Sequence, residues 1–401
     1  MDNVEIRLGV SVVDAANANG GVRVTLDKGG ESELVDAKYV VGCDGARSTM
    51  RSIVGTTITD LGYDEWWVVV DTHLIRNTQI PTRITQYCQP ERPGTFIVGP
   101  AALRRWEMKV LPGEDPQAFQ DPNVTKQALS RFVDVNAVEL LRVANYRFHA
   151  VVADKWRDGR IFLAGDAAHQ TPPFLGQGLC AGVRDAYGLA WKLDAVENGG
   201  WADSLLDTYM EERRPHVMEV VAFAKSFGEV IGELDEQAAR ERDRRLLEER
   251  RSRGDMFRHQ AIPDLNTGLI DDTTPGAGSL FPQPWVMGPD RQLTRLDELL
   301  GNGFAVVGVG SASPHDLSEI EGRLSRLESR VLLVALDGGG ESILVEQGTL
   351  LTDRAAKLGV KWFIVRPDRY IYATAKTMED VCARVSALSG FFNAPTRESG
   401  L

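Results

Sequence analysis

The strongest constraint on the fold is one short segment, residues 159–193, in which an apolar run, a turn and a helix pattern follow one another. The apolar run, residues 160–164, lies between two glycines and is typical of a buried strand. Asp166 stands just beyond it, at the carboxyl end of the predicted strand, where open α/β sheets bind ligands. The segment therefore predicts an α/β fold with a ligand site at this edge.

A rigid turn separates this strand from a predicted helix over residues 179–193. Pro172 and Pro173 restrict the turn, while Gly176 and Gly178 allow backbone N–H groups to approach a flat ligand closely. The N-terminus of the helix would stabilise the reduced form of an electron-accepting ring. The plainer interpretation, a strand, turn and helix with a capping aspartate, stays open on the residues alone.

A second motif lies upstream, over residues 39–48, and is typical of a buried strand that ends in a glycine turn and a helix start. It contains Asp44, Gly45, Arg47 and Ser48, with Arg51 one turn later. An Asp-Gly pair alone is a common turn, and the two arginines also fit a solvated helix surface. The significance of this motif depends on the downstream one.

In this order and rough separation, the two motifs resemble those of single-component FAD-dependent aromatic hydroxylases, the p-hydroxybenzoate hydroxylase-like family. The likeness is greatest to its 3-(3-hydroxyphenyl)propionate hydroxylase branch. It implies that Gly165 and Asp166 bind the ribityl chain of FAD and that Pro172 lies near the reactive edge of the ring. The remaining cofactor-binding residues that it implies are Asp44, Gly45, Arg47, Ser48, Gly176, Gln177 and Gly178.

Two further positions bear on the resemblance. His169 matches a recurrent histidine of the family and is a candidate catalytic residue beside Pro172, although a structural hydrogen-bonding role is the favoured interpretation. Many relatives carry Met-Asn after the last glycine, where this chain has Leu179 and Cys180.

The resemblance implies an FAD-dependent monooxygenase that hydroxylates a phenolic, phenylpropionate-like substrate with NAD(P)H and O2, through a C4a-hydroperoxyflavin. Two alternatives are a monooxygenase for a larger aromatic polyketide and an inactive chain that serves as an interaction module. The family begins with a Gly-x-Gly-x-x-Gly unit that holds the FAD pyrophosphate, and the printed sequence contains none. We therefore expect roughly one hundred residues to be missing, by truncation or natural loss, and FAD binding by this chain alone to be weak.

The expected architecture is a partial, glutathione-reductase-type Rossmann-like FAD domain, a β-sheet substrate domain and a thioredoxin-like C-terminal domain. The FAD domain is expected over residues 1–58 and 142–200, and the substrate domain over residues 59–141. A helical region and linker over residues 201–290 should lead to the C-terminal domain over residues 291–401. Strands are predicted over residues 4–8, 21–26, 66–70, 83–87, 95–98, 104–110, 305–309, 330–334 and 362–365.

Aromatic and basic residues of the substrate segment are candidate ligand contacts. Core packing is the favoured role for its aromatic residues, which are Trp66, Trp67, Tyr87, Phe96 and Trp106. A guanidinium group would bind a substrate carboxylate, and Arg83, Arg104 and Arg105 are the candidates.

Charge, apolar runs and cysteine spacing limit the binding partners that this chain is expected to have. A net charge of −12 disfavours nucleic acid, and no apolar run of membrane-spanning length occurs, so a cytoplasmic location is expected. The four cysteines are scattered without Cys-x-x-Cys spacing, so no metal site and no dithiol chemistry are expected. A homodimer is a candidate assembly, with the C-terminal domain as scaffold or dimer contact.

Overall fold

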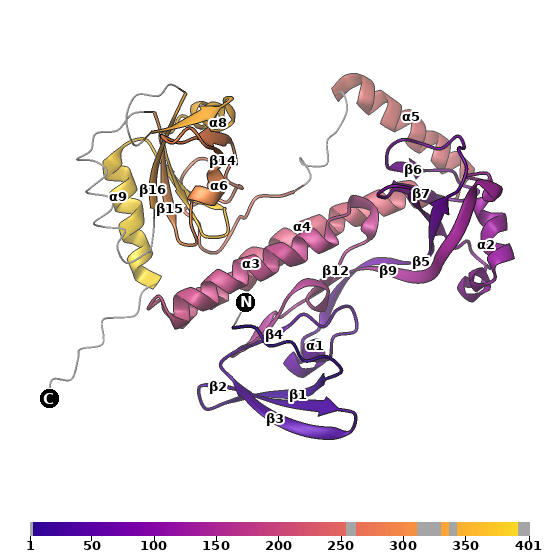
Figure 1. The fold of residues 1–401 in the computed structure, drawn as a ribbon, viewed down its shortest axis with the longest axis horizontal. Helices are drawn as coiled ribbons and strands as arrows, with labels where there is room; N and C mark the ends of the chain where they lie inside the picture. The colour runs from indigo at the N-terminus through magenta and orange to yellow at the C-terminus, as the bar shows by residue number, and fades with distance from the viewer. Residues whose placement is uncertain (1–2, 254–261, 311–329, 337–342, 392–401) are drawn as a thin grey trace. The chain divides into compact units, whose positions relative to one another are not determined.

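The computed structural model describes residues 3–253, 262–310, 330–336 and 343–391. The chain divides into two compact units (Figure 1). The first unit contains residues 1–180 and 218–262, and the second contains residues 181–217 and 263–401.

The first unit contains a short sheet in the order β10-β11-β4. Its strands are β4 (Val40–Gly42), β10 (Arg157–Asp158) and β11 (Ile161–Leu163), and β4 runs parallel to β11. All three residues of β11 are buried, as the apolar run predicts. Within the described residues, no strand pairs with the other edge of β4.

An antiparallel meander precedes this sheet, formed by β1 (Ser11–Ala18), β2 (Gly21–Lys28) and β3 (Glu31–Ala37). The strand expected over residues 4–8 is wrong, and β1 begins only at Ser11. Val4, Ile6 and Leu8 are exposed, so their alternation does not mark a face that packs on a core. Helix α1 (Thr49–Val54) follows β4, capped by Ser48 and ended by Gly55 in a left-handed conformation.

A six-stranded sheet, in the order β12-β9-β5-β8-β7-β6, confirms the strands predicted between residues 66 and 110. Its long central strands are β5 (Ile58–Leu74) and β9 (Val138–Ala153). The others are β6 (Thr85–Tyr87), β7 (Gly94–Val98), β8 (Leu103–Lys109) and β12 (His169–Gln170). The sheet runs past residue 141, the expected end of the substrate segment, because β9 continues to Ala153.

The two faces of this sheet differ in chemistry. One face, here called the Trp106 face, carries the core residues Val68, Phe96, Trp106 and Met108. These pack with residues of η1 (Pro116–Gln120) and α2 (Pro122–Leu129). The opposite face, called the Trp67 face, carries polar side chains beside aromatic ones.

Helices α3 (Gly178–Glu197), α4 (Asp207–Gly232) and α5 (Glu236–Arg253) confirm the predicted helices. Both α3 and α4 contribute residues to the two units. The charged surface of α5 carries ion pairs one turn apart, such as Arg240 with Glu236, as expected for a solvated helix.

The second unit is built on a seven-stranded sheet in the order β14-β13-β17-β16-β15-β18-β19. Its strands are β13 (Trp285–Met287), β14 (Leu293–Arg295), β15 (Ala305–Val309), β16 (Arg330–Ala335), β17 (Ile343–Gln347), β18 (Trp362–Val365) and β19 (Ile371–Ala375). Its helices include α6 (Leu296–Leu299), α8 (Leu350–Leu358) and α9 (Met378–Ala387). Alternate residues of β15 and β18 supply two separate apolar cores, so both faces of the sheet are covered.

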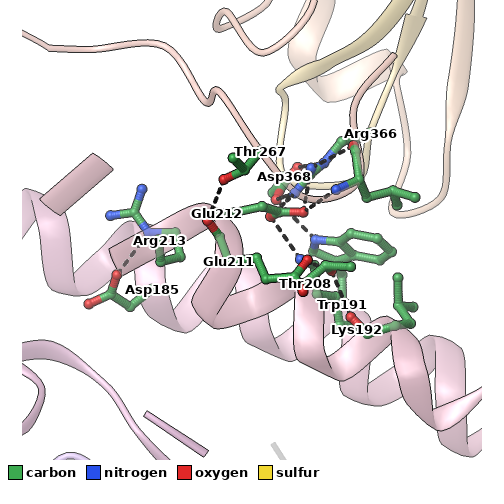
Figure 2. A network of polar contacts seen from close by, with 12 residues as sticks. Asp185, Trp191, Lys192, Thr208, Glu211, Glu212, Arg213, Thr267, Arg366 and Asp368 are labelled. Carbon is green, nitrogen blue, oxygen red and sulfur yellow. Dashed lines mark hydrogen bonds and ion pairs between the residues drawn. The ribbon is translucent and has the colours of Figure 1, made fainter. Parts of the chain in front are cut away.

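A buried ionic network joins the helices of the second unit to the Arg-Pro-Asp segment after β18 (Figure 2). Arg366 pairs with Glu212 at 2.7 Å and with Asp368 at 2.6 Å, and Glu212 also pairs with Lys192 at 2.7 Å. Trp191 Nε1 donates to Asp368 Oδ2 at 3.0 Å. Burial lowers the pKa of Lys192 to about 8. Arg366 and Asp368 thus anchor α3 and α4 through buried polar contacts.

Candidate functional site

The two sequence motifs meet at one edge of the short sheet of the first unit. Strands β4 and β11 are parallel neighbours, with Gly42 opposite Leu163, so the loops after both strands emerge side by side. Arg51 links these loops, since its guanidinium donates to the carbonyls of Ala167 at 3.0 Å and Ala46 at 2.7 Å. Gln170 also donates to Ala46 O at 3.2 Å. At the edge predicted to bind a ligand, hydrogen bonds therefore hold the two loops together.

Asp44 stabilises the first loop from within. One carboxylate oxygen accepts the Ser48 hydroxyl at 2.5 Å, and the other accepts the backbone N–H of Met50 at 2.9 Å. Burial alone would raise the pKa of Asp44, but these hydrogen bonds hold it below its usual value. Asp44 and Ser48 thus fix the start of α1, and Arg47 is exposed beside them.

Asp166 differs from Asp44 in its surroundings. Gly165 adopts a positive φ of 59°, which turns the chain sharply after β11 and places Asp166 on the exposed side of η3 (Gly165–Ala167). The Asp166 carboxylate makes no hydrogen bond or ion pair with any residue that the structure describes. It is therefore the carboxylate of this edge that is available to a ligand hydroxyl.

The turn over residues 171–178 contains two buried acceptors without a partner. Thr171 Oγ1 and Gln177 Oε1 are shielded from solvent, yet neither forms a hydrogen bond within the described part of the chain. Gly176 adopts a positive φ of 62°, and Gly178 has open space where a side chain would begin. An unpaired buried acceptor is costly, so both atoms are suited to donors of a bound molecule.

Aromatic packing fixes the position of this turn. Phe174 of η4 (Pro173–Leu175) meets Trp67 edge-on, with 5.1 Å between ring centroids, and lies at 6.0 Å from Tyr63. Gly228 of α4 lies against both Phe174 and Tyr63, because a Cβ there would stand 2.6 Å and 2.8 Å from their rings. The turn is thus wedged between the Trp67 face and α4, with Pro172 buried beside Phe174.

His169 is buried under the second loop. Its ring stacks on Trp156 at 5.5 Å, and its backbone pairs with Val152 of β9. This packing favours the structural role for His169, and its catalytic role stays a prediction.

The structure separates the three arginines proposed for a substrate carboxylate. Arg104 donates to nearby backbone carbonyls, including Ala101 O at 2.9 Å, and Arg83 is exposed in a loop. Arg105 lies on the Trp67 face and forms a two-pronged pair with Asp71, at 2.7 Å and 3.1 Å. Its hydrogen bonds and charge hold the pKa of Asp71 below its usual value. Arg105 is thus the candidate on the face that contacts the turn.

Sequence reasoning missed the polar residues of the Trp67 face. Arg142 approaches Asp71 at 3.6 Å and donates to the Tyr146 hydroxyl at 2.6 Å. Glu107 lies on the same face and is only 7% exposed. Alternation along β8 marks Arg105 and Glu107 as sharing one face, but strand periodicity alone does not tell whether that face meets solvent or a site.

The residues present fit part of an FAD molecule. Asp166 provides an acceptor for polyol hydroxyls, and the unpaired acceptors of Thr171 and Gln177 suit N–H or O–H donors of a flat polar ring. The described residues include no cluster of His, Cys, Asp or Glu suited to a metal ion. Across the same residues, no helix has the length and apolar character needed to traverse a bilayer.

Two family models match this chain. A model described as an FAD binding domain matches residues 2–224, and one described as an HcaD C-terminal domain matches residues 278–388. The chain is 35% identical to a probable NADH-specific resorcinol 4-hydroxylase of Rhodococcus jostii (strain RHA1), over 97% of this chain and 73% of that protein. It is 31% identical to a 3-(3-hydroxy-phenyl)propionate/3-hydroxycinnamic acid hydroxylase of Burkholderia vietnamiensis (strain G4 / LMG 22486), over 92% and 72%.

Solved structures share the fold. The flavin-dependent monooxygenase PieE, in complex with FAD and substrate, superposes with a TM-score of 0.76 at 20% identity, covering 96% of this chain and 75% of PieE. Aklavinone-11 hydroxylase, with FAD and aklavinone, gives a TM-score of 0.73 at 24% identity, covering 94% and 73%. Given the matched family model and the curated relatives, this chain belongs to the FAD-dependent aromatic hydroxylase family.

Proposed function

We propose that this chain hydroxylates a small, phenylpropionate-like phenol, using FAD, NAD(P)H and O2. The observation that carries the proposal lies at the carboxyl ends of β4 and β11. There Arg51 donates hydrogen bonds to the Asp44 loop and to the turn that presents Asp166, and so holds the two together. The same turn reaches the Trp67 face through Phe174. The proposed cofactor-binding edge of the short sheet therefore lies next to the polar and aromatic Trp67 face of the six-stranded sheet.

FAD, when bound, supplies the redox chemistry with NAD(P)H and O2. The chain supplies binding and orientation. Asp166 would accept hydrogen bonds from the ribityl hydroxyls, and Gln177 Oε1 with Thr171 Oγ1 would accept from the ring side of the cofactor. Trp67 and Phe174 would keep water away from the ring of the substrate, because both are buried and apolar.

Arg105 supports a substrate that carries a carboxylate. Arg105 and Arg142 both approach the Asp71 carboxylate, so two guanidinium groups lie together on the Trp67 face, where a substrate carboxylate would bind. A planar guanidinium matches a carboxylate in shape and charge. Resorcinol is a second candidate, because the relative at 35% identity is named for that substrate.

The test is a titration of the purified chain with FAD, followed by turnover assays. We expect flavin absorbance to co-purify or saturate, and a hydroxylated product from 3-(3-hydroxyphenyl)propionate or resorcinol with NADH or NADPH. An Arg105→Met variant should raise KM for the carboxylate substrate more than for resorcinol. Oxidation of NAD(P)H with release of hydrogen peroxide and no hydroxylated product from any phenol would contradict the proposal.

We also propose a thioredoxin-like arrangement for the C-terminal sheet. The parallel pair β15 and β16, the antiparallel pair β18 and β19, and the closing helix α9 support it. Since the sequence has no Cys-x-x-Cys pair, the role proposed is scaffolding or contact within a homodimer. Sedimentation of the purified chain at several concentrations tests the homodimer, and a single monomeric species would contradict it.

A further inference from the structure

Glu107 is a buried carboxyl group with no partner in its own sheet. It lies on β8 opposite Val69 of β5 and Thr95 of β7, and it is 7% exposed. Within the described residues, its side chain makes no hydrogen bond and no ion pair. The Glu107 carboxyl oxygens are therefore open to a hydrogen bond from a bound molecule.

The polar neighbours of Glu107 are bound to other groups. The Thr95 hydroxyl donates to Gln86 Oε1 at 2.5 Å, and Arg105 holds Asp71 with two nitrogens. Further along the same face, Arg142 is engaged with Tyr146. The sheet therefore leaves the Glu107 carboxyl to a group from outside it.

The position of Glu107 connects it with the cofactor turn. Val69, its cross-strand partner, is two residues from Trp67, so all three side chains lie on one face. Trp67 contacts Phe174 of the turn that contains the unpaired Thr171 and Gln177 acceptors. Neighbouring side chains on one sheet face lie roughly 5–8 Å apart, about the length of a phenol ring.

We propose that Glu107 accepts the hydroxyl proton of the phenolic substrate; this rests on the proposed function. In the transfer, the O–H bond of the phenol breaks and an O–H bond forms on a Glu107 carboxylate oxygen. The electron pair stays on the phenol oxygen, so the substrate becomes a phenolate and Glu107 becomes neutral. After hydroxylation, Glu107 returns the proton to the product oxygen and is again a carboxylate.

The chemistry of the reaction calls for such a group. A phenolate ring is richer in electrons than a phenol ring and attacks an electrophilic oxygen more readily. Burial, with a smaller contribution from Asp71, raises the pKa of Glu107 to about 7, against the opposing charge of Arg105. This brings the carboxyl closer to the pKa of a phenol, about 10, and makes it a stronger base when ionised. Arg105, with Arg142 behind it, supplies positive charge toward the phenolate.

The test measures ionisation of the bound phenol separately from turnover. The full chain, loaded with FAD, is mixed with 3-(3-hydroxyphenyl)propionate or resorcinol, and the phenolate band is followed by ultraviolet difference spectroscopy between pH 5.5 and 9. In the wild type, the bound phenol should ionise at least one pH unit below the free phenol. Glu107→Gln should abolish that shift and reduce hydroxylation at pH 7 at least tenfold, while Glu107→Asp should restore part of both.

Glu139→Gln is the matched control, because Glu139 lies in β9 of the same sheet and is exposed. It should leave the phenolate band and the pH profile unchanged. Glu107→Gln with wild-type ionisation of the bound phenol and a wild-type pH profile would overturn the proposal. A wild-type chain that ionises the bound phenol without hydroxylating it would contradict the proposed function and leave the role of Glu107 standing.

Discussion

Arg51 of α1 donates a hydrogen bond of 3.0 Å to the carbonyl of Ala167, across 116 positions of the chain. The same guanidinium holds Ala46 O at 2.7 Å, so one side chain joins the loop after β4 to the loop after β11. The Asp-Gly and Gly-Asp motifs, which sequence alone treats as separate turns, are therefore one structural unit.

Removing this link should weaken cofactor binding. We expect Arg51→Met to lower FAD affinity about tenfold, which corresponds to about 1.4 kcal/mol, because two hydrogen bonds that align the loops are lost. Quenching of flavin fluorescence during titration measures the affinity. Arg131→Met, at an exposed arginine, is the matched control. Equal affinities for the two variants would show that Arg51 does not position the site.

Replacing Asp166 should lower the affinity for FAD without changing the stability of the fold. The side chain is exposed and bonds to none of the described residues, so Asp166→Ala should leave the unfolding temperature within about 1 °C, as for other surface changes. FAD affinity should fall at least tenfold, since the hydroxyl groups of the cofactor lose a charged acceptor. Calorimetric titration with FAD measures this loss, and Asp272→Ala serves as an exposed control. Unchanged FAD affinity in Asp166→Ala would remove Asp166 from the site.

Local sequence patterns predicted where helices and strands lie better than they predicted what surrounds each of them. The apolar run of β11, the helix after Gly178 and the strands around Trp67 and Trp106 were all foreseen, because period and turn residues act locally. The strand expected near Ile6 was wrong, since alternation without a packing surface does not make a strand. Glu107 was missed because its meaning depends on what covers one sheet face, and that is set by residues far apart in the chain.

Buried His216 of α4 should make stability depend on pH. Burial and the positive charges of Arg213 and Arg184 lower its pKa to about 3. When folding lowers the pKa of a histidine, the contribution to stability is fully present at pH values above the unfolded-state pKa, near 6.5. It is lost as the pH falls from there toward the folded-state pKa, near 3. Between pH 7 and pH 4 we expect a loss of about 3 kcal/mol from this group. Urea unfolding at a series of pH values measures it.

His216→Phe separates this effect from other acid-sensitive groups. Glu212 lies in a buried ion pair in the same unit, and the charges of Arg366 and Lys192 lower its pKa to about 2 against the effect of burial, so it titrates at lower pH in both proteins. The difference between variant and wild type should therefore appear between pH 6.5 and 4. Parallel stability curves for the two proteins through that window would contradict a buried, neutral His216.

Gly228 should resist replacement by alanine. In the interior of a helix, Gly→Ala normally stabilises a protein by about 1 kcal/mol, because glycine loses more backbone freedom on folding. At Gly228 of α4, the new Cβ would stand 2.6 Å from the Phe174 ring and 2.8 Å from Tyr63, inside contact distance. Both rings are buried, so neither moves aside freely. We expect Gly228→Ala to destabilise the protein by about 1–3 kcal/mol and to displace the turn that presents Gln177. Thermal unfolding gives the first effect and FAD titration the second, and a variant more stable than the wild type would show that α4 does not wedge the turn.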